Sequence, residues 1–281
     1  MKESTLSFDC QGERLVGILA EPVTGEPAEV GVVIVVGGPQ YRAGSHRQFT
    51  LLARHFAAHG ITALRFDYRS MGDSPGEARD FLGVDADIAA AIGALRAARP
   101  GVKRVVLWGL CDAASAALLY VESTNDPRIA GLILLNPWVR SAATLARTHV
   151  KHYYWQRLRE REFWLKLLRG GVGRTALSTL GANLRLARGA HESAADSRSF
   201  QHRMADGLSG FSGAVLLILS GDDLTAKEFF EHALPSQVWQ KLLSRHNLRR
   251  VDLEHADHTL SRTSDQDLAF TLSLSTVQAL A

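Results

Sequence analysis

The segment Val105–Ala116, which reads VVLWGLCDAASA, decides the fold class. The run Val102–Trp108 that leads into it is apolar and β-branched and predicts a buried strand, whereas the small residues after Cys111 favour a helix. The intervening pentad GLCDA predicts a nucleophile elbow, a sharp turn that presents a side chain at a helix N-terminus. Gly109 and Ala113, the first and last residues of this pentad, must be small because the turn leaves no space beside the nucleophile. A buried structural cysteine is the alternative, but the strand, turn and helix together favour a nucleophile.

Runs of the same kind recur along the chain on both sides of this segment. Polar and apolar residues alternate at the N-terminus around Gln11-Gly12, which predicts a hairpin, and shorter all-apolar runs predict strands buried on both faces. The predicted strands are Ser4–Asp9, Arg14–Ala20, Val30–Val36, Ile61–Phe66, Val102–Trp108, Ile129–Leu135, Val215–Leu219 and Leu248–Leu253. The predicted helices between them include His46–His59, Val84–Ala98 and Cys111–Val121.

This alternation of strands and helices predicts an α/β fold with a mostly parallel, eight-stranded sheet flanked by helices. One segment, 138–210, contains no β-run and two helical patches, Thr144–Arg169 and Thr175–Arg188. It is too long for a loop, so we expect a helical cap or lid inserted into the core. The predicted domains are a core of residues 1–137 and 211–281 and a cap of residues 138–210.

The composition excludes several classes of protein. With 281 residues, 46% of them hydrophobic and 22% charged, the chain is unlike collagen, low-complexity disorder or a disulfide-rich secreted module. The formal net charge is +3, with 32 Lys and Arg against 29 Asp and Glu. Residues 138–210 hold 13 of these basic and 5 of these acidic residues, a balance of +8, which leaves −5 for the rest. The cap is therefore predicted to be basic.

The termini and the cysteines predict a cytoplasmic protein. No apolar run approaches the roughly 20 residues that span a bilayer, and the polar start Met1–Ser4 lacks the apolar stretch of a secretory signal. Cys10 and Cys111 are therefore expected to be free thiols in a reducing compartment. Cys10, in the predicted hairpin, is expected to have no role in catalysis.

Over nearly its whole length the chain resembles the α/β-hydrolases, with Cys111 where most members have serine. The turn Asp67–Ser74 is similar to the D-x-R-G-x-G-x-S loop, with Ser70 at the first glycine, and Gly37-Gly38-Pro39 to the H-G-G-P loop, with Val36 at the histidine. More narrowly, five segments resemble the exosortase A system-associated hydrolase 1 family of bacterial exopolysaccharide loci. They are Gly37–Phe49, Gly109–Ser115, His152–Leu168, Gly221–Ala226 and Ala256–Ser261.

In α/β-hydrolases the triad follows the chain order nucleophile, acid, base. The acid is expected after the strand Val215–Leu219, where Asp222 and Asp223 both stand, and the base after the last strand, where His255 and His258 both stand. The resemblance favours Asp223, with Asp222 capping the following helix, and it favours His258. The other position for an acid, after the preceding strand, holds an asparagine, which cannot serve as an anion.

The oxyanion hole of such an enzyme needs two backbone donors. The N–H of Asp112, the residue after the nucleophile, is expected to be one of them. The second should come from the loop after Val30–Val36, where Gly38 is favoured and Gln40 is the alternative, because Pro39 has no N–H. Gly37-Gly38 could also serve only to form the turn.

The predicted cap has aromatic residues among its bases, as in Tyr153–Trp155 and Phe163-Trp164. An amphipathic helix packing on the core would account for them. We favour a lid that encloses an acyl or sugar substrate and offers cations to an acidic partner or a membrane surface. The basic residues match no nucleic-acid-binding module, so we expect no nucleic-acid partner.

These residues predict hydrolysis of an ester or thioester through a thioester formed on Cys111, with His258 as base and Asp223 orienting it. The resemblance implies a glycan-linked or lipid-linked acyl substrate in exopolysaccharide biosynthesis. An acyltransferase using the same cysteine is the first alternative, because a thioester passes its acyl group readily to amines and thiols. A ligand-binding protein without turnover is the second. The sequence contains no metal cluster, nucleotide loop or cofactor lysine, so no metal or cofactor is expected, and it does not indicate an oligomeric state.

Overall fold

The computed structural model describes residues 1–23, 28–38, 40–140 and 198–281, and the chain divides into two compact units. The first unit combines Met1–Val139 with Phe200–Ala281, and the second is Arg140–Ser199. The two helical patches and the aromatic residues of the predicted cap lie outside the described residues. A cap built from them therefore stays a prediction.

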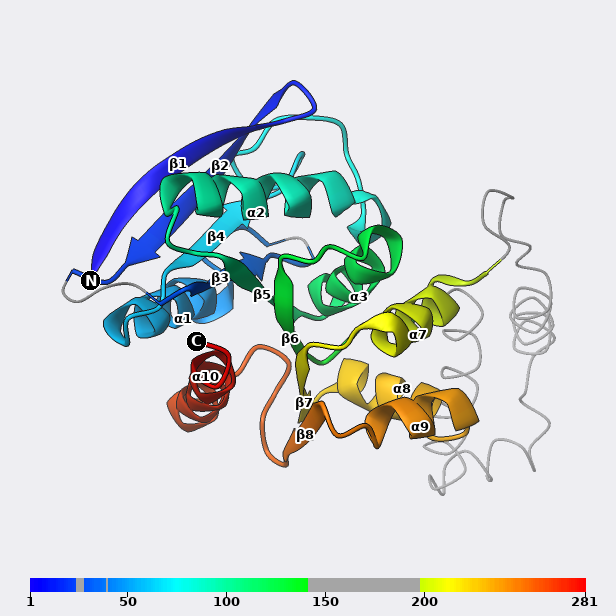
Figure 1. Ribbon diagram of the computed structural model, residues 1–281. Helices are drawn as coiled ribbons and strands as arrows, with labels where there is room; N and C mark the ends of the chain where they lie inside the picture. The colour runs from blue at the N-terminus through cyan, green and yellow to red at the C-terminus, as the bar shows by residue number, and fades with distance from the viewer. Residues whose placement is uncertain (24–27, 39, 141–197) are drawn as a thin grey trace, which may run out of the picture. The chain divides into compact units, whose positions relative to one another are not determined.

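The first unit is built on one eight-stranded sheet (Figure 1). Its strands are β1 (Lys2–Cys10), β2 (Glu13–Glu21), β3 (Val30–Val35), β4 (Ala63–Asp67), β5 (Arg104–Leu110), β6 (Ile129–Leu135), β7 (Ala214–Ser220) and β8 (Leu248–Leu253). They lie in the order β1-β2-β4-β3-β5-β6-β7-β8. The hairpin β1–β2 and the pair β2–β4 are antiparallel and all other pairs are parallel, which confirms the predicted mostly parallel sheet.

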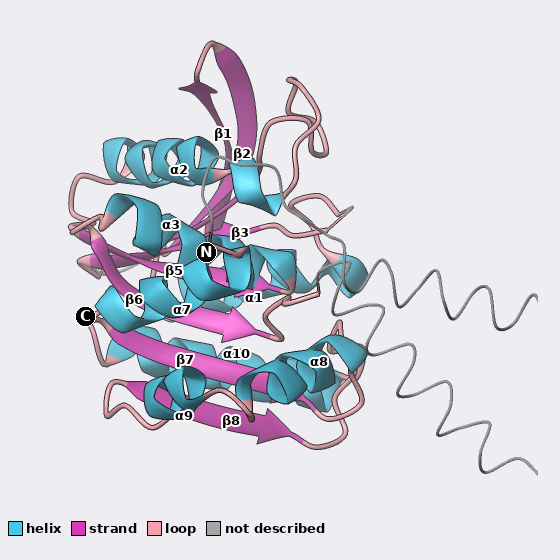
Figure 2. Cartoon of the chain, turned by 90° about the vertical axis from the view of Figure 1, so that its right-hand side faces the viewer, coloured by secondary structure: helices cyan, strands magenta, loops and turns pink. Residues whose placement is uncertain are grey.

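Helices cover both faces of this sheet (Figures 1 and 2). α1 (Gln48–Ala58) and α10 (Thr263–Gln278) pack on one face. The other face carries α2 (Asp85–Ala98), α3 (Asp112–Thr124), α7 (Phe200–Gly210), α8 (Leu224–Ala233) and α9 (Gln237–Leu243). Short 3₁₀ turns precede two of these helices, η1 at Ser45–Arg47 before α1 and η2 at Phe81–Gly83 before α2.

Each face of the sheet has its own apolar core. Along β3 the side chains alternate, with Val33 and Val35 in the core under α2 and α3 and with Val32 and Ile34 in the core under α1 and α10. All of them are at most 1% exposed, and burial of each such side chain contributes about 1.5–3 kcal/mol. Both faces of the strand are buried, which explains why its sequence is apolar throughout.

The hairpin places Cys10 in the first of these cores, where its thiol is free and 4% exposed. Burial raises the pKa of this thiol, so it is a poor nucleophile at neutral pH. Cys10 is therefore a core residue, in agreement with its expected lack of a role.

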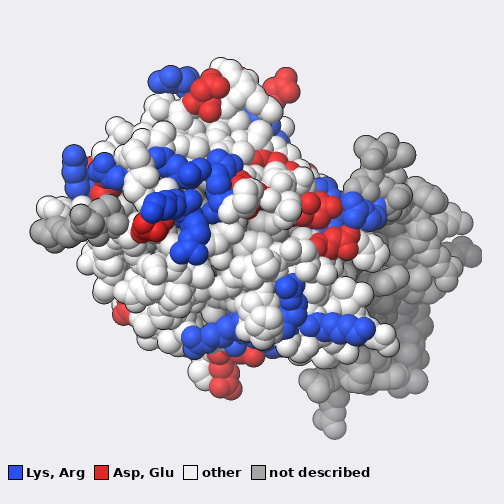
Figure 3. Space-filling model, viewed as in Figure 1, with Lys and Arg blue, Asp and Glu red and all other residues white. Residues whose placement is uncertain are grey.

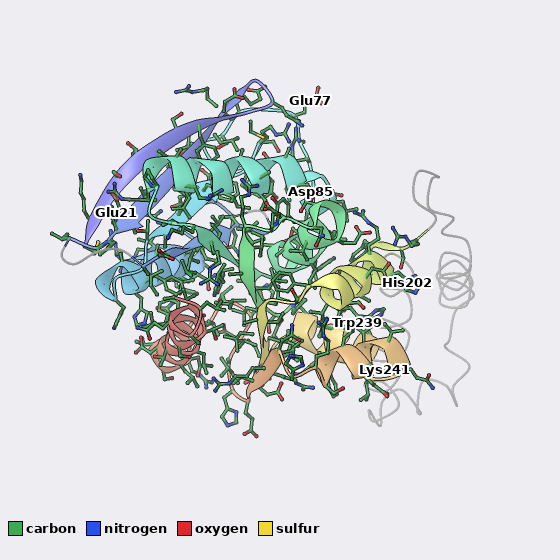
Figure 4. All side chains as sticks on the ribbon, viewed as in Figure 1. Glu21, Glu77, Asp85, His202, Trp239 and Lys241 are labelled. Carbon is green, nitrogen blue, oxygen red and sulfur yellow. The ribbon has the colours of Figure 1, made fainter. Side chains whose placement is uncertain are left out.

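In the same core, α9 is held by Trp239. The ring of Trp239 meets that of Phe229 on α8 edge-on, with 5.3 Å between the ring centroids (Figure 4).

The turn after β4 contains the departure from the D-x-R-G-x-G-x-S pattern, in which Ser70 replaces the first glycine. Ser70 stands where the pattern has its first glycine, and its φ of 69° lies in the left-handed region that favours glycine. Gly72 keeps the glycine of the pattern, because a Cβ there would lie 2.3 Å from Oδ2 of Asp67. The carboxylate of Asp67 also accepts a hydrogen bond from the N–H of Asp73 at 3.0 Å, which closes the turn. The loop therefore keeps its conformation with serine at one glycine position.

One helix of the segment 138–210 belongs to the first unit. α7 packs against α3, with Met204 fully buried and Leu208 2% exposed. A Cβ on Gly207 would lie 2.2 Å from the carbonyl oxygen of Leu118, so the two helices are in backbone contact at this position. The predicted cap boundary at 210 therefore included a helix that lies in the same unit as the sheet. Residues 200–210 share with the rest of the segment the lack of a β-run, and their composition does not identify α3 as the helix against which they pack.

The surface of the first unit carries charges of both signs. On the face in Figure 3, Lys and Arg side chains gather beside α2 and along the rim near α9, with Asp and Glu among them. Charged groups of the first unit also form ion pairs, as in Lys103 with Glu29 and Arg203 with Glu122. Among the described residues, no helix is both long and apolar enough to cross a membrane.

Candidate active site

Cys111 lies at the turn between β5 and α3. Its backbone has φ 62° and ψ −123°, a conformation that residues with a Cβ rarely adopt. Because α3 begins at the next residue, the turn places the cysteine side chain at the N-terminal end of the helix. This is the strained strand–turn–helix geometry of a nucleophile elbow.

Close packing holds this turn in place. A Cβ on Gly109 would lie 2.6 Å from the backbone C and O of Ala113, which is why small residues are required on both sides of the cysteine. The Cys111 N–H donates to the carbonyl of Leu135 at 2.9 Å, and the Cys111 carbonyl accepts from the N–H of Trp138 at 3.2 Å. The end of β6 and the residues after it therefore fix the elbow.

Asp223 and His258 come together at the carboxyl ends of β7 and β8. Oδ2 of Asp223 lies 2.9 Å from Nδ1 of His258. Asp223 is 5% exposed and also caps α8, because its Oδ1 accepts from the N–H of Thr225 at 3.0 Å and its Oδ2 from that of Ala226 at 3.2 Å. The helix cap holds the carboxylate in one orientation, and the carboxylate in turn orients the imidazole.

The imidazole of His258 also faces Cys111. Side-chain hydrogen bonds with Asp223 and with Cys111 raise the pKa of His258 from 6.5 to about 10, and burial opposes them. Since Nδ1 is occupied by Asp223, Nε2 is the nitrogen that remains for the thiol. The imidazole therefore lies between a carboxylate and a sulfur, and both contacts favour its protonated form.

The structure also places the alternative residues. Asp222 and His255 are both exposed, and neither has a hydrogen bond to Cys111, Asp223 or His258 among the described residues. The expected cap of α8 by Asp222 is wrong: Asp223 caps this helix, because α8 begins at Leu224 and Asp223 is the residue directly before it. Asn136, at the other acid position, is fully buried and hydrogen-bonds to Ser220 through both its amide oxygen and its amide nitrogen.

The structure brings both residues of the predicted oxyanion hole together. The N–H of Gly38, one of the two predicted donors, donates to the side chain of Asp112, with 2.9 Å between the Gly38 nitrogen and Oδ2. Gly38 has φ 62°, as expected for a glycine turn. The alternative donor, Gln40, uses its side-chain Oε1 to accept from the N–H of Ser45 at 3.4 Å.

Sequence reasoning missed the side chain of Asp112, because it considered only the backbone N–H of this residue. It also missed Asp257, which shapes the loop of His258: its Oδ1 accepts from the N–H groups of Thr259 at 3.0 Å and Ser261 at 3.1 Å. An aspartate two and four residues before these amides is a recognisable turn signal. The hydrogen bond between Gly38 and Asp112 joins residues 74 positions apart, so no local sequence pattern indicates it.

The fold and this site define a class of protein. A model of the alpha/beta hydrolase family matches residues 32–269 of the chain. The chain belongs to the alpha/beta hydrolase family.

Individual proteins share parts of the sequence or the whole fold. The quorum-quenching protein AidA of Acinetobacter baumannii strain MDR-ZJ06 is 29% identical over 137 residues, which are 47% of this chain and 43% of that protein. The chain therefore matches less than half the length of this curated relative.

Among solved structures, the esterase Pf2001 of Pyrococcus furiosus is similar with a TM-score of 0.65 and 14% identity, over 99% of this chain and 92% of that one. The alpha/beta hydrolase GrgF of Penicillium sp. sh18 has a TM-score of 0.65 and 18% identity, over 99% of both chains. Est1E of Butyrivibrio proteoclasticus, solved with ferulic acid, has a TM-score of 0.63 and 16% identity, over 97% of this chain and 99% of that one. At these identities the similarity concerns the fold.

Proposed function

We propose that this alpha/beta hydrolase cleaves an ester or thioester with Cys111 as nucleophile, His258 as acid and base, and Asp223 as the group that orients the imidazole. The observation that carries the proposal is the position of Cys111 at the elbow, next to an imidazole whose other nitrogen lies 2.9 Å from a buried carboxylate. The esterase among the structural neighbours supports the same class of reaction.

The raised pKa of His258 makes its imidazole a stronger base than usual, and in the proposed mechanism Nε2 takes the proton of the Cys111 thiol. The Cys111 thiolate forms a bond to the carbonyl carbon, and the carbonyl π electrons move to oxygen. When this oxyanion collapses, the bond to the leaving alkoxide or thiolate breaks, and Nε2 of His258 gives its proton to the leaving group. A water molecule then loses a proton to Nε2, its oxygen attacks the thioester, and the carboxylic acid and the thiolate of Cys111 are released.

Alkylation with iodoacetamide tests the activated thiol. At pH 7 a free cysteine is only a few per cent thiolate, so an ion-paired Cys111 should react about 30-fold faster than free cysteine. The variant His258→Ala should return the rate to that of a free thiol. Cys10 is the internal control, because it is buried and should stay unlabelled in both proteins when the labelled peptide is identified by mass spectrometry. Equal labelling rates in the wild type and His258→Ala would contradict the proposal.

Acyl transfer is the second candidate, and the cysteine favours it, since a thioester passes its acyl group to amines and thiols as well as to water. Turnover of p-nitrophenyl acetate, measured with and without an added amine or alcohol, distinguishes the two. Release of p-nitrophenolate that rises with the acceptor, together with the acylated acceptor as product, identifies a transferase. An unchanged rate with acetate as the sole acyl product identifies a hydrolase.

The substrate proposal rests on the resemblance of GLCDAAS and four other segments to the exosortase A system-associated hydrolase 1 family. We extend the proposal to a glycan-linked or lipid-linked acyl group in exopolysaccharide biosynthesis. A screen of short-chain and long-chain acyl esters and thioesters, with acetylated oligosaccharides as a third set, tests it. Turnover confined to simple short-chain esters would contradict the glycan and lipid assignments.

A further inference from the structure

The side chain of Asp112 accepts a hydrogen bond from the N–H of Gly38, which the proposed reaction would use to stabilise an oxyanion. Its Oδ2 lies 2.9 Å from the nitrogen of Gly38, in the loop after β3. This bond joins residues 74 positions apart, so it is a tertiary contact and not the local capping of a helix.

The distance from Oδ2 of Asp112 to the Gly38 nitrogen is the distance expected for an oxyanion of the reaction. Oxyanion-hole donors lie about 2.7–3.1 Å from the oxygen that they stabilise, and Gly38 is the expected donor from its loop. Burial raises the pKa of Asp112, and the backbone N–H groups of Gly38, Ala113 and Asp112 itself oppose this rise. A side-chain oxygen of the protein therefore already accepts from the N–H that is expected to stabilise a substrate oxyanion.

The lack of a side chain at Gly37, in the loop after β3, leaves room for this carboxylate. A Cβ on Gly37 would lie 2.1 Å from Oδ1 of Asp112, so any side chain at this position would collide with the carboxylate. Oδ1 itself is buried and has no hydrogen-bond partner among the described residues. The carboxylate is therefore accommodated in this place but only half satisfied, which lowers the cost of moving it.

The charges around Asp112 link it to the reacting groups. Burial raises the pKa of Asp112, and the charge of His258 lowers it, so the imidazole and this carboxylate lie within electrostatic reach. Tyr68, the residue after β4, is also within electrostatic reach, since burial and then the charge of Asp112 raise the pKa of its phenol. A substrate oxyanion bound to the N–H of Gly38 would lie beside the Asp112 carboxylate, and like charges at such a distance repel.

We propose that the Asp112 side chain is a resident occupant of the oxyanion hole and that a substrate carbonyl must displace it before Cys111 can be acylated. The proposal rests on the proposed function. It makes Asp112 a selectivity residue: acyl compounds that cannot displace the carboxylate react slowly, although the thiol beside it is activated.

Two reactions of the same thiol test this. Acylation by p-nitrophenyl acetate passes through an oxyanion and needs the hole, whereas alkylation by iodoacetamide displaces iodide at a saturated carbon and does not. In Asp112→Ala the ratio of the acylation rate to the alkylation rate should rise by about 100-fold, the effect of one oxyanion-hole donor. Asp112→Asn keeps the shape without the charge and should lie between the wild type and Asp112→Ala. Asp85→Ala removes an aspartate (labelled in Figure 4) from the first turn of α2, where its carboxylate accepts from the hydroxyl of Ser123 near the C-terminal end of α3, and should leave the ratio unchanged.

A free carboxylate should close the emptied hole again. Sodium acetate should inhibit acylation of Asp112→Ala but not that of the wild type, with sodium chloride at equal ionic strength as the control. This readout separates occupancy of the hole from a purely structural role, because a structural defect would not create an acetate site. Thermal unfolding of each variant establishes that it is folded, and Asp112→Ser is the substitute if Asp112→Ala is not.

An unchanged or lower ratio in the folded variants overturns the proposal, the lower ratio because it would make Asp112 a contributor to acylation. Failure of the proposed function gives a different result. In that case Cys111 is alkylated no faster than a free thiol in the wild type and in Asp112→Ala alike. Rapid alkylation without acylation in Asp112→Ala leaves the activated thiol standing and rejects the occupied hole.

Discussion

Asp223 has two structural roles at once. It is the residue before α8 and caps that helix, and it also accepts a hydrogen bond from Nδ1 of His258 at 2.9 Å. Both roles use the same carboxylate, which is 5% exposed. A substitution that removes the side chain therefore mixes a loss of stability with a loss of imidazole orientation, and only an isosteric change separates them.

Asp223→Asn makes this separation. Asparagine caps helices as well as aspartate does, so the free energy of unfolding should change little, whereas turnover should fall by about 10²–10⁴-fold because the imidazole loses its anionic partner. Asp223→Ala should lose both, with about 0.5–2 kcal/mol of stability from the missing cap. Urea unfolding and acyl-ester turnover measure the two effects.

Asp222→Asn is the matched control, because it makes the same change at the exposed neighbouring residue. It should leave both turnover and stability unchanged. Loss of turnover in Asp222→Asn with full activity in Asp223→Asn would show that the acid has been assigned to the wrong residue.

His258 should make the stability of the protein depend on pH. Its pKa is raised from 6.5 to about 10 in the folded state, so the folded protein holds a proton that the unfolded chain releases between these values. The stabilisation is fully present below pH 6.5 and is lost as the pH rises towards 10. The difference in unfolding free energy between the wild type and His258→Gln, measured with urea at pH 6, 8 and 10, should therefore shrink with rising pH. A difference that stays constant or grows would contradict the protonated imidazole.

At the scale of elements, the junction of β5 and α3 concentrates the close contacts of the site. The positive φ of Cys111 is tolerated because the turn is hydrogen-bonded to the end of β6. The amide of Asn136 then ties the end of β6 to Ser220 at the end of β7. The carboxyl ends of three adjacent strands are thereby fixed relative to one another, which places the loops that carry Cys111 and Asp223 side by side.

Gly109→Ala tests how much this junction depends on close approach. The added methyl group would lie 2.6 Å from the backbone of Ala113, so we expect a loss of about 1–3 kcal/mol in unfolding free energy together with a loss of Cys111 alkylation. Gly93→Ala is the control, because a Cβ there meets nothing within 4 Å in the middle of α2. It should stabilise the protein by about 0.5–1 kcal/mol. Equal effects of the two substitutions in urea unfolding would argue against a crowded elbow.

At the scale of the whole molecule, the first unit is made from two stretches of chain whose ends meet. The side chain of Gln201 donates to the carbonyl of Val139 at 3.0 Å, so the points at which the chain leaves and re-enters this unit are in contact. A short linker can therefore replace the segment between them. Because α7 follows directly and is buried against α3, the point of re-entry lies before Phe200.

Two deletions test this boundary. Replacing 141–197 by a short Gly-Ser linker should give a protein that unfolds cooperatively, whereas replacing 138–210 should give an unfolded or aggregated one. The larger deletion removes α7 and with it Met204 and Leu208, and each lost core side chain of this size costs about 2–5 kcal/mol. Circular dichroism during heating and gel filtration distinguish the two outcomes. Cooperative unfolding of the larger deletion would show that α7 is dispensable.

Much of the architecture could be predicted from local patterns. The predicted strands Ile129–Leu135 and Leu248–Leu253 coincide with β6 and β8, because an apolar run between turn residues is a property of a short stretch of chain. The expected start of the helix at His46 is two residues early, since η1 occupies Ser45–Arg47 and α1 begins at Gln48. Which residue caps α8 could not be predicted, because Asp222 and Asp223 are chemically identical and only the exact start of the helix distinguishes them.

The sequence by itself determined the class of this protein: the order of strands and helices and the elbow around Cys111 follow from apolar periodicity and from the space that Gly109 leaves, and both act over a few residues. Only the tertiary structure decided which carboxylate meets which histidine, that α7 lies with the sheet, and that the Asp112 side chain takes the N–H of Gly38. The physical reason is that these contacts join loops at the ends of neighbouring strands. Their partners depend on how the packed helices bring those ends together, and no single stretch of chain specifies that arrangement.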